Sequence, residues 1–534
     1  MRRLARHHAG AIAVAVLVLA VAAQAAADTW TLRLKRRQSN PTSFDRESYV
    51  YWSTYPQYFQ MQIGPPNSPV RYETPDQAAF KRIVKKEPKY VSKHPFRGVA
   101  KLGSQDYAFA LDTSAPDRPE AKEAKPGAKK AETESALAEL TEKFAKAAPP
   151  TTLVPYDRLY FDFNRNGDLT DDGVIKTEGR SAVQSFSNGS YCAFNFPCID
   201  VTIDVEGTKL DYAFFLSGYL NVSSDYGYAG LQLHSAVCRE GDITLEGKKR
   251  HVVLIDFNSN GRFDDEMKIA RNVTVARGQV NPVYPEQGDM LLVDPTVGMQ
   301  FDSPYDVTAS DYRHTVGKLV NIDGHFYDMK VSPAGDKLTL TPSTVPLGSV
   351  TNRNGRFRAM IYGERGFLAI RGDKDKPALV PEGTWKLLNY TITETVAPEP
   401  AKPAEKKPAE KSGSAVSALT GALSALFGGS SGVAVPSRPR VSLVAAQATA
   451  DCKAIKVEKG KTVEFPFGPP YTPRVSIPPY RMQPGEVALE MSLIGSAGEV
   501  CSNIMVDGGR PAKPEFTITD PKGQVVQEGN FEYG

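Results

Sequence analysis

Short runs in which apolar and polar residues alternate recur along most of the chain. Residues 201–205, Val-Thr-Ile-Asp-Val, are a clear example. Alternation with a period of two places the apolar side chains on one face of a strand. Residues 318–322, 326–331 and 338–341 form three further runs, separated by Asp-Gly and Pro-Ala-Gly turn sequences. The pattern predicts a mainly β protein of tandem β-sandwich or β-meander domains.

Two stretches depart from the strand pattern in composition. Residues 114–150 are rich in Ala, Lys, Glu and Pro and contain one aromatic residue, Phe144. Residues 397–439 are again low in complexity and begin with a stretch of Pro, Ala, Glu and Lys, Pro-Glu-Pro-Ala-Lys-Pro-Ala-Glu-Lys-Lys-Pro. Such compositions bury little apolar surface, so both are interpreted as solvated insertions, the first disordered or helical. The strand at 385–392 has no turn of its own, and its pattern resumes at Val441, which places the second insertion inside one β unit.

Two shorter stretches carry further expectations. Gly-Tyr-Ala-Gly at 227–230 predicts a turn. Residues 49–61 gather six aromatic side chains. This aromatic cluster is either core packing or a sugar-stacking surface, and core packing is the expectation because aromatic side chains dominate buried area.

The first 27 residues have the pattern of a secretory signal peptide. Arg2, Arg3 and Arg6 precede an apolar run from 11 to 23, and small residues at 25–27 fit a cleavage site. Export to the periplasm, cell surface or extracellular space is therefore expected, with no transmembrane segment after cleavage. Retention of the segment as an anchor is the alternative. The remaining chain divides into a domain at 28–300 and a C-terminal β region at 301–534.

The charge balance excludes some partners. The chain has 64 Lys and Arg against 61 Asp and Glu, and the signal segment holds three of the Arg. The rest is therefore balanced at 61 of each, because 64 − 3 = 61. A balanced chain has no electrostatic footprint for nucleic acid or an anionic membrane.

Five cysteines are too few to form the framework of a chain of this length. Export makes disulfides possible. Cys452–Cys501 is the expected pair because both lie in one β unit, Cys192–Cys198 is next, and Cys238 is left free. Connectivity does not follow from sequence.

Residues 254–266 carry the most specific chemistry. An apolar strand leads into Asp-Phe-Asn-Ser-Asn-Gly, followed by a run of acids. Asp256, Asn258 and Asn260 stand at loop positions 1, 3 and 5, where calcium loops place side-chain oxygens. Gly261 permits the sharp turn at position 6. The carbonyl of Arg262 serves position 7 and Asp264 position 9, with Asp265 behind it.

The same arrangement occurs at residues 160–172. Its ligand set has seven members: Asp162, Asn164, Asn166, Asp168 through its carbonyl, Thr170, Asp171 and Asp172. Because Thr170 stands at position 9, this loop is expected to bind calcium more weakly than the second. Oxygen-only ligands of this kind suit a hard cation. A plain hairpin is the alternative, since Asn-Gly between strands is a strong hairpin sequence.

The two loops resemble the Asp-x-Asn-x-Asp-Gly calcium loops of dockerins and of FG-GAP repeats. The resemblance covers about a dozen residues per copy and implies calcium as the bound ion. It departs from EF-hands at position 12, where Gly173 and Met267 stand in place of Glu. The closing acid is therefore expected among Asp171, Asp172, Asp264 and Asp265. The whole chain resembles uncharacterised, exported β-rich bacterial proteins, and its last hundred residues resemble immunoglobulin-like sandwiches.

No catalytic motif accompanies these loops. The sequence has no His-Glu-x-x-His, P-loop or Gly-x-Gly-x-x-Gly motif, and no Gly-x-Ser-x-Gly elbow between an expected strand and helix. The sequence therefore favours an exported, non-catalytic β scaffold or binding protein, stabilised by calcium, with a glycan or an envelope protein as its partner. A secreted hydrolase acting on polysaccharide is the alternative, because two carboxylates can meet in space without a motif.

Overall fold

The architecture was obtained as a computed structural model. It describes residues 27–36, 55–63, 77–114, 155–179, 183–186, 189–223, 227–270, 280–295, 312–373, 375–396, 440–477, 487–507 and 509–533. The expected signal peptide and both expected insertions lie outside these ranges, apart from Ala27 and Ser114. Among the described residues, no helix is long and apolar enough to span a bilayer.

The chain forms two compact units. The first comprises Met1–Asn272, Tyr284–Val345 and Tyr362–Ala369, and the second Val273–Val283, Pro346–Ile361 and Ile370–Gly534. The main division between the units therefore falls near Val345, whereas the sequence suggested a boundary at residue 300. The meander at 319–342 belongs to the first unit because its last strand pairs with the strand at Asp28–Thr31.

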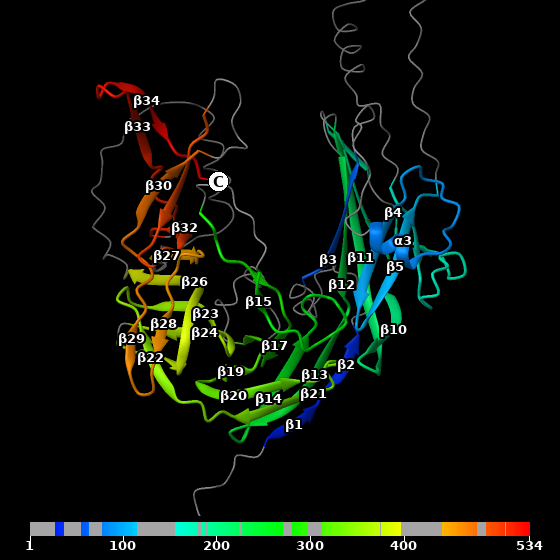
Figure 1. Ribbon diagram of the computed structural model, residues 1–534, viewed down its shortest axis with the longest axis horizontal. Coiled ribbons are helices and arrows are strands. Elements are labelled where there is room, and N and C mark those ends of the chain that lie inside the picture. The colour runs from blue at the N-terminus through cyan, green and yellow to red at the C-terminus, as the bar shows by residue number, and fades with distance from the viewer. Residues whose placement is uncertain are drawn as a thin grey trace, which may run out of the picture. The chain divides into compact units, whose positions relative to one another are not determined.

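The first unit contains five sheets and one described helix (Figure 1). The four-stranded sheet has the order β1 (Asp28–Thr31), β21 (Lys337–Pro342), β20 (His325–Val331), β19 (Leu319–Ile322). The six-stranded sheet has the order β3 (Gln57–Ile63), β12 (Gly227–Ser235), β11 (Thr208–Ser223), β9 (Gly189–Asn195), β8 (Val183–Phe186), with β10 (Ile199–Val205) also on β11. The five-stranded sheet has the order β18 (Arg313–Thr315), β17 (Met290–Val293), β14 (Lys248–Ile255), β13 (Val237–Leu245), β2 (Arg33–Arg36).

Each of the two remaining sheets of this unit contains a strand next to one of the candidate loops. One has the order β4 (Phe96–Leu102), β5 (Gln105–Asp112), β6 (Arg158–Phe161), β7 (Ile175–Lys176), and the other pairs β15 (Lys268–Ile269) with β16 (Pro285–Glu286). The helix α3 (Gln77–Ile83) packs beside β4. A single apolar core, containing Phe109, Phe161, Phe214, Leu254 and Leu338, joins strands of four of these sheets.

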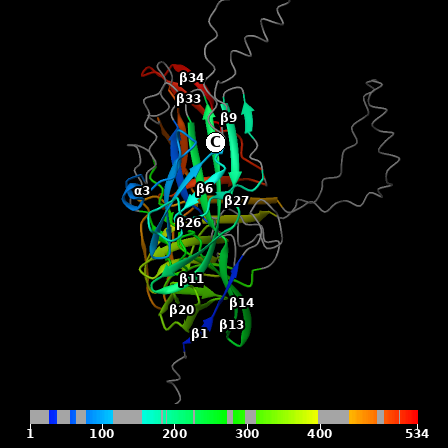
Figure 2. The ribbon, with the colours of Figure 1, turned by 90° about the vertical axis from the view of Figure 1, so that its right-hand side faces the viewer.

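The chain from Pro346 onward forms three further sheets. One has the order β25 (Ala378–Pro381), β22 (Leu347–Thr351), β29 (Thr462–Glu464). The largest has the order β24 (Gly366–Gly372), β23 (Phe357–Gly363), β26 (Gly383–Val396), β27 (Arg440–Gln447), β32 (Val500–Met505), β31 (Glu490–Ile494), β30 (Thr472–Ser476), with β28 (Ile455–Val457) on β26. The hairpin β33 (Glu515–Thr519) and β34 (Val525–Asn530) is the third (Figure 2).

The predicted mainly β fold is confirmed, and its multiple antiparallel sheets fit a tandem β-sandwich arrangement. The immunoglobulin-like character of the C-terminal part stays a prediction. The expected turn at residues 227–230 is wrong, because these residues open β12 and pair with both β11 and β3. The predicted disulfides Cys452–Cys501 and Cys192–Cys198 are also contradicted, since none of the five cysteines, all of them among the described residues, is in a disulfide. The Cys452 sulfur accepts a hydrogen bond from the Thr449 amide instead, and Cys501 donates to the Asn503 carbonyl.

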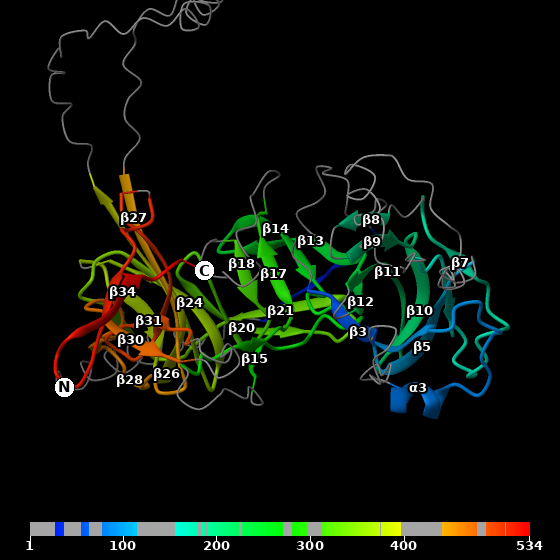
Figure 3. The same cartoon turned by 90° about the horizontal axis from the view of Figure 1, so that it is seen from above.

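The strands on either side of residues 397–439 pair with each other. β26 and β27 form one antiparallel ladder in which Val396 lies opposite Arg440 (Figure 3). The strands that flank residues 114–150, β5 and β6, pair in the same way, with Asp112 opposite Arg158. Both stretches therefore connect adjacent strands of a sheet.

This register allows residues 397–439 to be replaced by a two-residue Asn-Gly turn. We expect the shortened protein to melt at the same temperature as the parent or higher, because closing a longer loop costs more entropy, by up to about 3 kcal/mol here. Differential scanning calorimetry of both proteins measures this. A lower melting temperature for the shortened chain would show that the replaced residues contribute contacts to the fold.

Candidate metal sites

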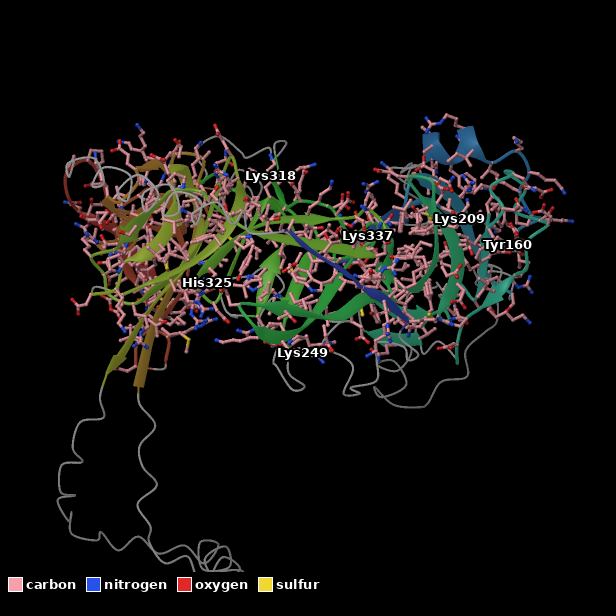
Figure 4. All side chains as sticks on the ribbon, turned by 90° about the horizontal axis from the view of Figure 1, so that it is seen from below. Tyr160, Lys209, Lys249, Lys318, His325 and Lys337 are labelled. Carbon is pink, nitrogen blue, oxygen red and sulfur yellow. The ribbon has the colours of Figure 1, made fainter. Side chains whose placement is uncertain are left out.

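The first loop begins where β6 ends. Tyr160, labelled in Figure 4, lies on β6, and Asp162 follows the strand directly. The Asp162 side chain is fully buried. Its Oδ2 accepts a hydrogen bond from the Gly167 amide at 3.0 Å, whereas Oδ1 is buried without a hydrogen-bond partner among the described residues. A buried carboxylate oxygen without a donor is costly unless a cation or water satisfies it.

The two asparagines of the first loop face the same acid. The Nδ2 groups of Asn164 and Asn166 both donate to Oδ2 of Asp171, at 3.4 and 2.6 Å. Their Oδ1 atoms accept from backbone amides two residues on, at Asn166 and Asp168. Positions 3, 5 and 10 of the loop are therefore gathered at one place.

The remaining acids of the first loop divide between two roles. Asp172 lies on the inside of the loop, where its Oδ2 accepts from the Phe163 amide at 3.0 Å. The Asp168 side chain turns the other way, to Thr170 and to Nζ of Lys86 at 2.8 Å. These contacts lower the pKa of Asp168 to about 2, chiefly through Lys86. The role of the Asp168 carbonyl as a ligand stays a prediction, and the Thr170 hydroxyl donates to the Asp168 side chain.

The second loop begins where β14 ends. Lys249, labelled in Figure 4, marks the start of this strand, and Asp256 follows its end. Asp256 is fully buried and accepts hydrogen bonds from the amides of Asn260 and Gly261, at 3.0 and 2.8 Å. The Tyr212 hydroxyl donates a third, at 2.6 Å. The bond from the position 6 glycine repeats the one that Gly167 makes in the first loop.

The side-chain amides of the asparagines in the second loop make the same contacts as those in the first. The Nδ2 groups of Asn258 and Asn260 donate to Oδ2 of Asp265, at 3.1 and 2.7 Å. Oδ1 of Asn260 accepts from the Arg262 amide. Oδ1 of Asn258 is buried with no hydrogen-bond partner in the described part of the chain.

Position 9 of the second loop does not join this cluster. Asp264 is held by its neighbour Arg262 through two hydrogen bonds, at 3.0 and 2.9 Å, and Arg262 also pairs with Glu206 at 2.8 Å. Asp264 therefore lies outside the hydrogen-bonded cluster of the loop, whereas Asp265 at position 10 lies in it, and the position 9 ligand stays a prediction. Asp171 holds position 10 in the first loop.

A residue that sequence reasoning missed completes the second loop. Asp289 is fully buried just before β17, and its two oxygens accept from the amides of Phe257 and Asp265, at 2.9 and 2.8 Å. It occupies the role that Asp172 has in the first loop. The only sign in the sequence was an acid immediately before a wholly apolar strand, which is an unusual place for an unpaired charge.

Asp256, Asp265 and Asp289 lie close enough together for their negative charges to repel one another. Burial raises the pKa of Asp256 to about 7, and the charge of Asp265 adds to the rise. Burial also raises the pKa of Asp289 well above its ordinary value, with further contributions from Asp256 and Asp265. In the first loop, burial raises the pKa of Asp162 and of Asp172. A bound cation would reverse this electrostatic penalty.

The loops are anchored through their glycines. Gly167 and Gly261 have φ values of 82° and 80°, and a Cβ on either would lie within 2.5 Å of Ile83 O or of Ile203 Cδ1. The Gly167 carbonyl accepts from the amides of Lys85 and Lys86, after α3. Phe263 of the second loop belongs to the main core. Both loops are thus fixed to the sheets of the first unit.

The described residues contain no group of three or more His, Cys, Asp or Glu side chains already arranged to hold a metal ion. The carboxylates of each loop are held by N–H donors, so a cation would have to draw them away from these donors. The donor set nevertheless suits calcium, since it consists of carboxylate, amide and carbonyl oxygens. Oδ1 of Asp162 and Oδ1 of Asn258 are buried without a hydrogen-bond partner among the described residues. A calcium ion bound to these oxygens would replace the missing hydrogen bonds.

The comparisons give no independent guide to the ion or to the function. Searches against protein-family models, curated proteins and solved structures find no match to this chain.

Proposed function

We propose that this protein is an exported, non-catalytic β scaffold or binding protein, with calcium as the ion of its two loops. The observation that carries the proposal is the hydrogen-bond scheme that the loops share. In each, a buried Asp accepts from the position 6 glycine, two asparagines converge on the position 10 Asp, and the position 2 phenylalanine amide donates to another acid.

The last of these contacts is the most informative. Asp172 supplies the acid from within the first loop, whereas Asp289 supplies it from a separate strand in the second. Two different chain paths thus bring three carboxylates near enough to raise one another's pKa, although they are not yet arranged around a common point. A plain Asn-Gly hairpin gains nothing from three clustered acids, which repel one another. A cation site accounts for all three.

The expected role of the ion is structural. The loops end β6 and β14 and contact the core of the first unit, so an ion there would fix strand ends rather than act on a substrate. Export remains part of the proposal through the signal-like first 27 residues. Localisation to the cell envelope or the extracellular space fits the weak calcium affinities, about 10⁻⁴–10⁻³ M, that suffice in extracellular modules.

Isothermal titration calorimetry of the full chain with calcium tests the proposal. We expect two sites in the wild type, and one site each in Asp162→Ala and Asp256→Ala. Each substitution removes the position 1 ligand of one loop and leaves the other loop intact. A titration with magnesium is the control, because magnesium demands a stricter octahedral geometry and dehydrates reluctantly. Absence of calcium binding in the wild type would mean that both loops are hairpins.

A further inference from the structure

The outer face of the six-stranded sheet carries four tyrosines. The strands β3, β12, β11, β9 and β8 lie side by side in this order (Figure 3). Residues opposite one another in the ladders share a face of the sheet. Tyr58 on β3 lies opposite Gln232 on β12, and Tyr219 on β11 lies opposite Gly230 on β12. Asn221 on β11 lies between Tyr228 on β12 and Tyr191 on β9 and is paired with both. Each such set of opposite residues forms a row across the sheet. We call the surface formed by Tyr58, Tyr191, Tyr219 and Tyr228 the tyrosine face.

The opposite face of the same strands belongs to the core. Phe59, Leu231 and Phe194, which alternate with the tyrosine face, are at most 6% exposed. Tyr58 is 41% exposed, and Gln60 beside it is also exposed. The aromatic residues of β3 therefore divide between two roles, with Phe59 in the core as the sequence suggested and Tyr58 at the surface.

Tyr219 is the centre of the tyrosine face. A Cβ on Gly230 would lie 2.5 Å from its Cζ, so the ring lies across the neighbouring strand at a position that only glycine leaves open. The Tyr219 hydroxyl is hydrogen-bonded to the hydroxyl of Tyr58. Its ring stacks on Tyr191, at 6.2 Å and 21°, and meets the edge of Tyr228 at 5.6 Å. The four rings form one connected platform.

The neighbours of these tyrosines are neutral and polar. Gln60, Gln232, Asn221, Ser217 and Gln184 lie on the same face and bring amide and hydroxyl groups beside the rings. None of the described residues of these rows is charged. An anionic polymer requires Lys or Arg contacts, which the described residues of these rows do not offer.

We propose that the tyrosine face binds a neutral polysaccharide. The C–H faces of sugar rings can stack on exposed aromatic rings, and sugar hydroxyls can exchange hydrogen bonds with amides and tyrosine hydroxyls. The lack of charge on the face matches a ligand without charge. This inference rests on the proposed function as a binding protein and names its ligand class. The rings are held by the ladders of the six-stranded sheet, and Gln57 of β3 also donates to the Ser259 carbonyl of the second loop.

Affinity electrophoresis of the full chain tests the inference, in gels containing soluble β-glucan, xylan, galactomannan, dextran or starch. We expect at least one of these to retard the wild type. Tyr219→Ala and Tyr58→Ala should each weaken that binding at least tenfold, and Gly230→Ala should do the same by displacing Tyr219. Tyr284→Ala is the matched control, since Tyr284 is 49% exposed but lies outside the tyrosine face.

Four outcomes would overturn the inference. Three concern binding: no retardation by any neutral polysaccharide, retardation only in a further gel that contains anionic polygalacturonate, and retardation that the tyrosine variants do not change. The fourth is a wild-type dimer that becomes monomeric in Tyr219→Ala, which would show a protein interface instead. Calcium titration of the same variants separates this from the proposed function, because Tyr219→Ala should keep both calcium sites and Asp256→Ala should keep polysaccharide binding.

Discussion

Asp265→Asn is expected to remove the calcium-dependent stabilisation that the second loop gives to the first unit, whereas Asp264→Asn is expected to preserve it. Asp265 is the acid on which Asn258 and Asn260 converge, and Asp264 is already bound by Arg262. Both substitutions remove one charge and almost no volume, so they are matched. Asp289→Asn should behave as Asp265→Asn does, because its carboxylate faces the same interior.

The expected effect is measurable by thermal melting in EDTA and in 1 mM calcium. A site with Kd near 10 μM stabilises the folded state by about 2.7 kcal/mol at this concentration. For a unit of this size that corresponds to a shift of about 5 °C or more. Asp265→Asn and Asp289→Asn should lose this shift, apart from the smaller part that the first loop contributes.

The reverse order of the calcium-induced melting shifts of these two variants would contradict this ligand assignment. If Asp264→Asn lost the shift and Asp265→Asn kept it, calcium would bind through position 9, after release of the Arg262 pair. If the wild type showed no shift, neither loop would be a calcium site.

The parts of the loops that could be predicted are those fixed by local chain geometry. Asp256, Asn260 and Gly261 lie within one turn, so their spacing determines which side chain meets which amide. The choice between Asp264 and Asp265 depended on Arg262, whose side chain is shared with Glu206 from another hairpin. Asp289 comes from a separate strand. Contacts of this kind arise from the tertiary fold and leave no local pattern.

The β class was predictable for the same reason, since alternation reports directly on strand faces. Gly227 and Gly230 were misread because a glycine pair indicates a turn wherever the tertiary context is unknown. In the structure Gly230 instead leaves room for the Tyr219 ring. The two disulfide predictions failed for a similar reason, because membership of one β unit does not bring two sulfur atoms to bonding distance.

Glu499→Ala is expected to cause the largest loss of stability in the second unit. Glu499 is fully buried, and three donors from separate segments meet its carboxyl group. Its Oε1 accepts from the Tyr390 hydroxyl at 2.9 Å and from the Gly468 amide at 2.6 Å, and Oε2 accepts from the Ala497 amide at 2.9 Å. Burial, and then the proximity of Glu499, raises the pKa of Tyr390, so this hydroxyl stays a donor.

Truncation to alanine would leave the Gly468 and Ala497 amides without their acceptor, whereas the Tyr390 hydroxyl keeps the Tyr471 hydroxyl as a partner. Each buried donor without an acceptor costs about 1–3 kcal/mol. We therefore expect Glu499→Ala to lower the free energy of unfolding of the second unit by about 3 kcal/mol or more. Glu499→Gln should lose less, since its amide oxygen still accepts from one side. Glu464→Ala, at an exposed position of the same unit, is the control and should change stability by no more than about 0.5 kcal/mol. Urea unfolding followed by circular dichroism measures all three. Equal stability of Glu499→Ala and Glu464→Ala would mean that water replaces the carboxylate. A loss of stability confined to Glu499→Ala and Glu499→Gln, with an unchanged calcium response of the first unit, would support the expected role. Glu499 would then be the polar group that joins β26 to the turn before β32.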